Sequence, residues 1–129
     1  MKTIHKRLSL FGLFIFLFAS CIFLFKSCII QNPRPENCTE VKTTITKIEE
    51  SVSYDIRFYG TTDNYYINRG LEQGLNLDSL NAKVLNKSVT LHLANVIGNT
   101  TTAHIVQLEV EGDTIYSEFP DYVKKQKHK

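Results

Sequence analysis

Two clusters of carboxylates and two histidines are the residues of this 129-residue sequence that could do acid/base chemistry. They are Glu49 with Glu50, Glu109 with Glu111 and Asp113, and the histidines His92 and His104. Acid/base catalysis needs carboxylates whose environments differ, so that one is protonated while the other is ionised. Both clusters fall at expected turns, where water reaches every carboxylate. We therefore interpret them as solvated surface groups.

The spacing of the other reactive residue types favours neither a metal site nor a nucleophile. His92 and His104 are separated by many residues, and no CxxC or HxxxH pattern is present. The sequence also has no glycine-rich phosphate loop and no GxSxG motif. We expect a non-enzymatic protein with no catalytic residues, no metal and no other cofactor.

The first 30 residues have the composition of a membrane anchor. Residues 8–25 are all uncharged, and as a helix they would be about 27 Å long, close to the thickness of the bilayer core. Lys2, Lys6 and Arg7 precede this run and Lys26 follows it, which favours a cytoplasmic N-terminus and an extracytoplasmic C-terminal domain. We expect an uncleaved single-pass helix whose partner is the lipid bilayer, contacted through residues 8–25.

Two other interpretations of this segment stay open. A cleaved secretory signal also begins with basic residues, although its apolar core usually runs about 7 to 15 residues. The sequence FASC at residues 18–21 loosely resembles a lipobox, which would make the chain a lipoprotein modified at Cys21. A mature chain beginning at Cys21 would carry apolar residues where lipoproteins usually have a polar tether. Cys28 and Cys38 either form a bridge, which an oxidising compartment would permit, or remain thiols.

From residue 38 onward the sequence alternates as β-strands do. The expected strands are 41–48, 52–59, 65–68, 88–94, 104–110 and 114–119, with a polar loop at 97–102 and a hairpin turn at Gly112-Asp113. One short helix is expected where Leu77, Leu80 and Val84 recur at helical spacing. Asn76 is its expected N-cap and Asn86 its terminator. The lysine-rich end is expected to be a solvated tail.

Strand parity also predicts the core, with His104 at the start of its strand on the inward face. The residues expected to build the core are Val52, Tyr54, Ile56, Phe58, Leu80, Val84, Val89, Leu91, Leu93, Val106, Leu108 and Val110.

The order of three strands, a helix and two strands resembles the OB-fold, a small five-stranded Greek-key barrel. We therefore expect a mainly β fold with some α+β content, an OB-like barrel with one short helix over residues 38–119. An anchor (1–30) containing a transmembrane helix and a Pro-containing linker (31–37) would precede it, and a basic tail (120–129) would follow. The segment YYINRGLEQGLNLDSL also resembles one in small uncharacterised bacterial membrane-anchored envelope proteins. That resemblance implies no activity, because no chemistry is assigned to the group.

The OB resemblance implies ligand binding on the outer face of the second and third strands and the neighbouring loops. Parity places Asp55 at the start of this face, and the candidate ligand-binding residues on it are Arg57, Tyr59, Tyr66, Asn68 and, at the rim, Arg69. Tyrosines beside arginines form a surface on which single-stranded nucleic acid stacks. The alternative is that these side chains only cover a small barrel. Residues 31–123 hold seven basic and 13 acidic residues, a net charge of −6, which would repel a polyanion.

The sequence thus predicts a single-pass membrane-anchored, non-enzymatic OB-like binding or interaction module of the cell envelope. Its expected partner, besides the bilayer, is an envelope protein or a small ligand of unknown identity. Two alternatives are a nucleic-acid-binding OB domain facing the cytoplasm, which the charge disfavours, and a small envelope hydrolase.

Overall fold

The structure is a computed structural model that describes residues 2–26, 33–96 and 98–128, with the side chains of the first helix described over residues 7–22. The chain divides into two units, Met1–Gln31 and Asn32–Lys129. The first unit holds helix α1 (Lys2–Lys26), whose large apolar side chains between Leu8 and Ile22 are 48% to 74% exposed. Among the described residues, no helix combines the length and the hydropathy needed to cross a bilayer.

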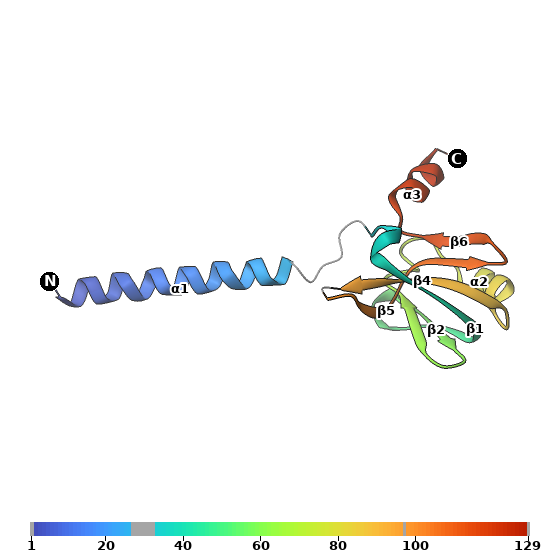
Figure 1. The fold of residues 1–129 in the computed structure, drawn as a ribbon, viewed down its shortest axis with the longest axis horizontal. Coiled ribbons are helices and arrows are strands. Elements are labelled where there is room, and N and C mark those ends of the chain that lie inside the picture. The colour runs from blue at the N-terminus through green and yellow to red at the C-terminus, as the bar shows by residue number, and fades with distance from the viewer. Residues whose placement is uncertain (1, 27–32, 97, 129) are drawn as a thin grey trace. The chain divides into compact units, whose positions relative to one another are not determined.

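The second unit is built on a sheet that closes on itself (Figure 1). Its strands are β1 (Cys38–Glu50), β2 (Ile56–Gly60), β3 (Asn64–Ile67), β4 (Ser88–Val96), β5 (Thr100–Val110) and β6 (Asp113–Ser117). The order in the sheet is β3-β2-β1-β4-β5-β6, and a parallel pairing of β3 with β5 closes the first five strands into a mixed barrel. The predicted small closed barrel is therefore confirmed, and this architecture is consistent with an OB-like barrel.

The long strand β1 makes closure possible because its two halves pair with different neighbours. Residues 38–44 pair with β4, and residues 45–50 pair with β2 across a register shift between Ile45 and Lys47. The extra strand β6 pairs with the last part of β5, from Gln107 to Val110, beyond the point where β3 meets β5 at His104.

Helix α2 (Leu77–Val84) lies between β3 and β4 in the sequence, as predicted. The side chain of Asn76 accepts a hydrogen bond from the backbone N–H of Ser79 at 3.0 Å, which is the N-cap interaction expected from the residue type. Leu80 and Val84 are buried against the barrel core. Asn86 follows the helix with φ 58°, a left-handed conformation that asparagine tolerates and that stops the helix.

The predicted second strand is wrong over its first half. Val52–Tyr54 form a 3-10 turn in the loop between β1 and β2, and Val52 and Tyr54 are 82% and 56% exposed instead of buried. The loop is closed by the Ser51 N–H, which donates to the Asp55 carbonyl at 2.8 Å. Ser53 and Tyr54 both have φ 63°, so the apolar alternation here lies outside any strand.

The predicted inward and outward sides of β5 are also partly wrong. Ile105, expected outside, and Val106, expected inside, are both fully buried. The register with β4 shifts next to Leu93, which pairs with Ile105, and a shift of this kind turns two successive side chains to the same side. β5 begins at Thr100, so the second half of the predicted polar loop 97–102 is strand, while Gly98 and Asn99 form a turn and Ile97 lies outside the described residues.

The basic end of the chain, predicted as a solvated tail, is exposed to solvent and helical. Helix α3 (Pro120–Lys127) starts at a proline, whose fixed φ suits the first turn of a helix, and it contains no buried residue. The remaining core prediction is confirmed: Ile56, Phe58, Leu80, Val84, Val89, Leu91, Leu93, Val106, Leu108 and Val110 are buried. Among the described residues, parity missed seven further buried apolar side chains, namely Ile45, Ile48, Tyr65, Ile67, Ala94, Ile105 and Tyr116.

Phe58→Ala should lower the free energy of unfolding by about 3 to 5 kcal/mol, because it removes a fully buried aromatic side chain and leaves a cavity. Val52→Ala should change it by less than about 0.5 kcal/mol, because Val52 lies in the exposed turn. Urea unfolding of the full-length chain in non-ionic detergent, followed by tyrosine fluorescence, measures both. Equal losses for the two variants would contradict the burial described for this loop.

Candidate functional site

The five predicted site residues lie on β2, on β3 and in the turn that follows β3. Arg57 and Tyr66 are direct cross-strand partners, and Tyr59 pairs with Asn64 two positions along. Side chains two positions apart on neighbouring strands are still within reach of aromatic rings. The structure therefore brings Arg57, Tyr59 and Tyr66 onto one outer face of the barrel.

Tyr59 is already engaged by side chains of β1. The ammonium group of Lys47 lies 5.0 Å from the centre of the Tyr59 ring, and the Tyr59 hydroxyl donates a hydrogen bond to Glu49. Lys47 and Glu49 also form an ion pair. Hydrogen bonds from Lys47 and then Tyr59 lower the pKa of the Glu49 carboxyl. These contacts hold Tyr59 in a local cluster and leave less of its ring free for a ligand.

Arg69 and Asn68 contribute mainly to the turn. The guanidinium of Arg69 forms an ion pair with Glu72 at 2.6 Å, and the Arg69 backbone N–H donates to the Asp55 carboxylate at 2.8 Å. The Asn68 carbonyl accepts a hydrogen bond from the Gln73 side chain at 2.8 Å. The charge of Arg69 is therefore already balanced, although both side chains are exposed.

Arg57 and Tyr66 remain as the accessible pair. Arg57 is exposed, and within the described part of the chain no carboxylate lies within ion-pair distance of its guanidinium. Tyr66 is 36% exposed, and its ring meets the His104 ring edge-on with 5.4 Å between centroids. This contact orients Tyr66 and leaves part of its ring open to solvent.

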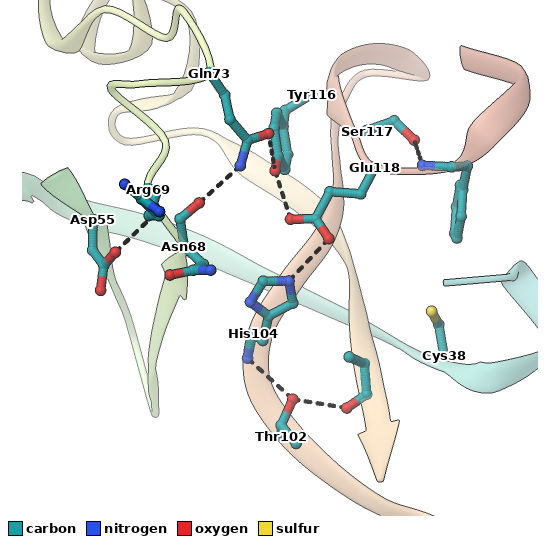
Figure 2. A network of polar contacts seen from close by, with 12 residues as sticks. Cys38, Asp55, Asn68, Arg69, Gln73, Thr102, His104, Tyr116, Ser117 and Glu118 are labelled. Atoms are coloured by element: carbon teal, nitrogen blue, oxygen red, sulfur yellow. Dashed lines mark hydrogen bonds and ion pairs between the residues drawn. The ribbon is translucent and has the colours of Figure 1, made fainter. Parts of the chain in front are cut away.

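His104 connects this face to a polar network that was not predicted from the sequence (Figure 2). His104 Nε2 lies 3.1 Å from Glu118 Oε2, and the Tyr116 hydroxyl donates to Glu118 Oε1 at 2.6 Å. The same hydroxyl lies 3.0 Å from Gln73 Oε1. Gln73 is far in the sequence from Tyr116 and Glu118, and none of the three belongs to a motif. The pairing of β5 with the chain around β6 places Tyr116 and Glu118 beside β5, and Gln73 joins them through the Tyr116 hydroxyl.

Two groups near this network have raised pKa values. Burial, followed by the hydrogen bond and negative charge of Glu118, raises the pKa of the Tyr116 phenol well above its ordinary range. Burial, and then Glu118 and Glu36, raise the pKa of the Cys38 thiol. The Cys38 thiol donates to the Arg34 carbonyl at 3.4 Å. The disulfide considered from the sequence would join Cys38 to Cys28, and Cys28 lies outside the described residues.

One member of each carboxylate cluster considered for catalysis has a side-chain partner in the structure. Glu109 accepts a hydrogen bond from Gln107 and lies 3.5 Å from His92 Nε2, while Glu49 is held by Lys47 and Tyr59. Glu111 and Asp113 are exposed at the hairpin between β5 and β6. Within residues 2–26, 33–96 and 98–128, no group of three or more histidine, cysteine or carboxylate side chains is placed to hold a metal ion.

Comparison with known proteins finds no protein-family model, no curated relative and no solved structure that matches this chain.

Tyr116 should make the protein less stable in alkali. The folded state keeps the Tyr116 proton, whereas the unfolded chain loses it near the ordinary pKa of about 10, so this contribution is present below about pH 10 and falls above it. The expected loss is about 1.4 kcal/mol per pH unit for one such group. Urea unfolding of the full chain at about pH 9, 10 and 11 measures the slope.

Tyr116→Phe should remove this part of the slope, although it lowers stability at every pH because it removes the hydroxyl that donates to Glu118 Oε1. Tyr54→Phe is the matched control, since it removes an exposed hydroxyl from the loop before β2. If Tyr116→Phe and the unchanged chain lost stability in parallel above pH 10, the burial of the phenol would not hold in solution.

Proposed function

We propose that this protein is a single-pass membrane-anchored, non-enzymatic OB-like binding module of the cell envelope, which binds its partner on the outer face of β2 and β3. The observation that supports this most is the accessible pair of Arg57 and Tyr66. Both lie on the face that OB-folds use for ligands, and they are direct cross-strand neighbours. Around them, Lys47, Glu49 and Arg69 have their charges balanced within the protein.

This pair fits a ligand in which an acidic group lies next to a flat or apolar one. The Arg57 guanidinium can bind a carboxylate through two parallel hydrogen bonds. The Tyr66 ring, which packs edge-on against His104, offers a rigid apolar surface that loses little conformational entropy on binding. A segment of an envelope protein that carries an exposed carboxylate meets both requirements. A small carboxylate-bearing ligand is the other member of the same chemical class.

Charge favours this class of partner over nucleic acid. The net charge of −6 over residues 31–123 opposes the collection of a polyanion. The lysines that could counter it, Lys124, Lys125 and Lys127, lie on α3 and not on the β2–β3 face. The cytoplasmic nucleic-acid module therefore receives less support than a protein-binding or small-ligand module.

Membrane attachment is proposed from the N-terminal sequence. The uncharged run of residues 8–25 lies within α1, and the described part of it carries its apolar side chains exposed at 48% to 74%. Burying such side chains in lipid is favourable by about 25 cal/mol per Å². The basic residues before the run support a cytoplasmic N-terminus and an extracytoplasmic domain.

Phe16→Arg should weaken membrane attachment, because an arginine at the centre of a spanning helix costs about 2.5 to 3.5 kcal/mol on insertion scales. Extraction of membranes with alkaline carbonate, followed by detection of the chain in pellet and supernatant, measures this. Cys21→Ser is the matched control and should stay in the membrane. Intact-mass measurement of the mature chain should give all 129 residues, with or without Met1.

Either of two results would contradict the uncleaved anchor. A mass that begins at Cys21 and includes a diacylglycerol would establish the lipoprotein. A shorter, unmodified species in the soluble fraction would show that the segment is a cleaved signal.

A photo-crosslinking amino acid at Tyr66 should capture the partner in cells. We expect a discrete adduct for benzoylphenylalanine at position 66, because the aromatic replacement keeps the ring in contact with the ligand. The same amino acid at Ala82, which is exposed on α2, is the matched control and should give no such adduct. Adding Arg57→Glu should remove the adduct at position 66. A failure to crosslink at position 66, or equal adducts at both positions, would contradict the proposed face.

A further inference from the structure

Helix α3 is attached to the domain at the place where the chain enters it. A groove of about 540 Å³ is lined by residues 33–36, by Gln107 and by residues 119–122 with Lys125. The Tyr122 hydroxyl donates to the Thr114 carbonyl at 3.4 Å, and the Phe119 ring meets the His92 ring edge-on at 6.1 Å. These contacts attach the start of α3 to β6 and β4, and the shared groove places it next to residues 33–36.

The rest of α3 projects from the barrel and presents positive charge to solvent (Figure 1). Lys124, Lys125 and Lys127 are exposed, and Asp121 is the helix's one carboxylate. In the described part of the chain, no carboxylate lies within ion-pair distance of these three lysines. The described part of the barrel therefore forms no ion pair with these three lysines.

The position of α3 in the chain indicates what could neutralise it. Pro33 lies eight residues after Phe25, the last residue of the apolar run, and eight residues reach at most about 29 Å. If residues 8–25 lie in a bilayer, this linker keeps Pro33 within about 29 Å of the end of the apolar run, a distance from which α3 can reach the lipid headgroups. Val123, 39% exposed beside the lysines, adds an apolar side chain of the kind that enters the interface.

We infer that α3 binds anionic phospholipid headgroups through Lys124, Lys125 and Lys127, with Val123 inserted at the interface. This inference rests on the proposed membrane attachment, and it gives the anchored domain a second contact with the membrane. Each lysine near an anionic surface strengthens binding about fivefold, and this effect falls off within a Debye length. α3 is thereby proposed as the surface that sets how the domain lies on the bilayer.

The absence of tryptophan from the chain allows a direct test. Full-length Val123→Trp is reconstituted into phosphatidylcholine vesicles with or without phosphatidylglycerol at roughly one third of the lipid. Chain-brominated phosphatidylcholine then quenches a tryptophan that enters the interface. We expect quenching at least about twofold greater, with a blue-shifted emission, in the anionic vesicles.

Two matched variants decide the result. Ala82→Trp places the probe on exposed α2 and should be quenched weakly and equally in both vesicles. Val123→Trp combined with Lys124→Glu, Lys125→Glu and Lys127→Glu should behave like Ala82→Trp, and so should Val123→Trp in about 1 M salt, where the Debye length is about 3 Å. Equal quenching of the Val123→Trp probe in the two kinds of vesicle, or no effect of the charge reversal, would overturn the inference.

Flotation of the same vesicles separates this inference from the proposed attachment. A chain that floats with pure phosphatidylcholine while its α3 probe behaves like the α2 probe leaves the anchor intact and overturns the α3 contact alone. A chain that fails to float with either kind of vesicle overturns both.

Discussion

The barrel depends on one parallel contact between β3 and β5, where Tyr66 pairs with His104. The other neighbouring strands of the barrel are antiparallel and pair over longer stretches. A parallel pair cannot be joined by a hairpin, and here the chain passes through the turn after β3, α2 and β4 before it returns. Closure therefore relies on contacts between residues far apart in the sequence, and these include the edge-on packing of Tyr66 against His104.

The polar network adds a second set of contacts beside the pairing of β3 with β5. Glu118 contacts both His104 and Tyr116, and Tyr116 reaches Gln73, which in turn donates to the Asn68 carbonyl (Figure 2). The turn after β3 is thereby tied to the hairpin of β5 and β6. Half-buried polar groups stabilise a fold only when they are satisfied, and among the described residues no buried side-chain polar atom lacks a hydrogen-bond partner.

The sequence predicts well the elements whose burial has a simple period. In β4, Val89, Leu91 and Leu93 alternate and are buried, and the Asn76 cap begins α2 where expected. Prediction fails where local geometry breaks the period. Val52 and Tyr54 alternate like strand residues but lie in a turn with left-handed backbone, and the register shift beside Ile105 turns a predicted outward side chain inward.

The candidate site was predictable to the same extent. Parity placed Arg57, Tyr59 and Tyr66 on one face because a pleated strand alternates strictly, and β2 and β3 contain no bulge relative to each other. It could not show that Lys47 and Glu49 from β1 already engage Tyr59, since that depends on the pairing of β1 with β2. Nor could it find Glu118, whose importance comes from its contact with His104 across strands.

Tyr66 belongs both to the β3–β5 pairing that closes the barrel and to the face proposed for binding. A ligand would pack on the exposed side of the Tyr66 ring, while His104 contacts the same ring from within the barrel wall. Ligand binding and barrel closure therefore both involve Tyr66. A ligand that binds only the folded state stabilises that state by mass action, and here the stabilisation falls on the strand pair with the shortest pairing. The basic surface of α3, by contrast, takes no part in the β3–β5 pairing, and no residue of α3 is buried. Its charges can therefore vary without disturbing closure of the barrel.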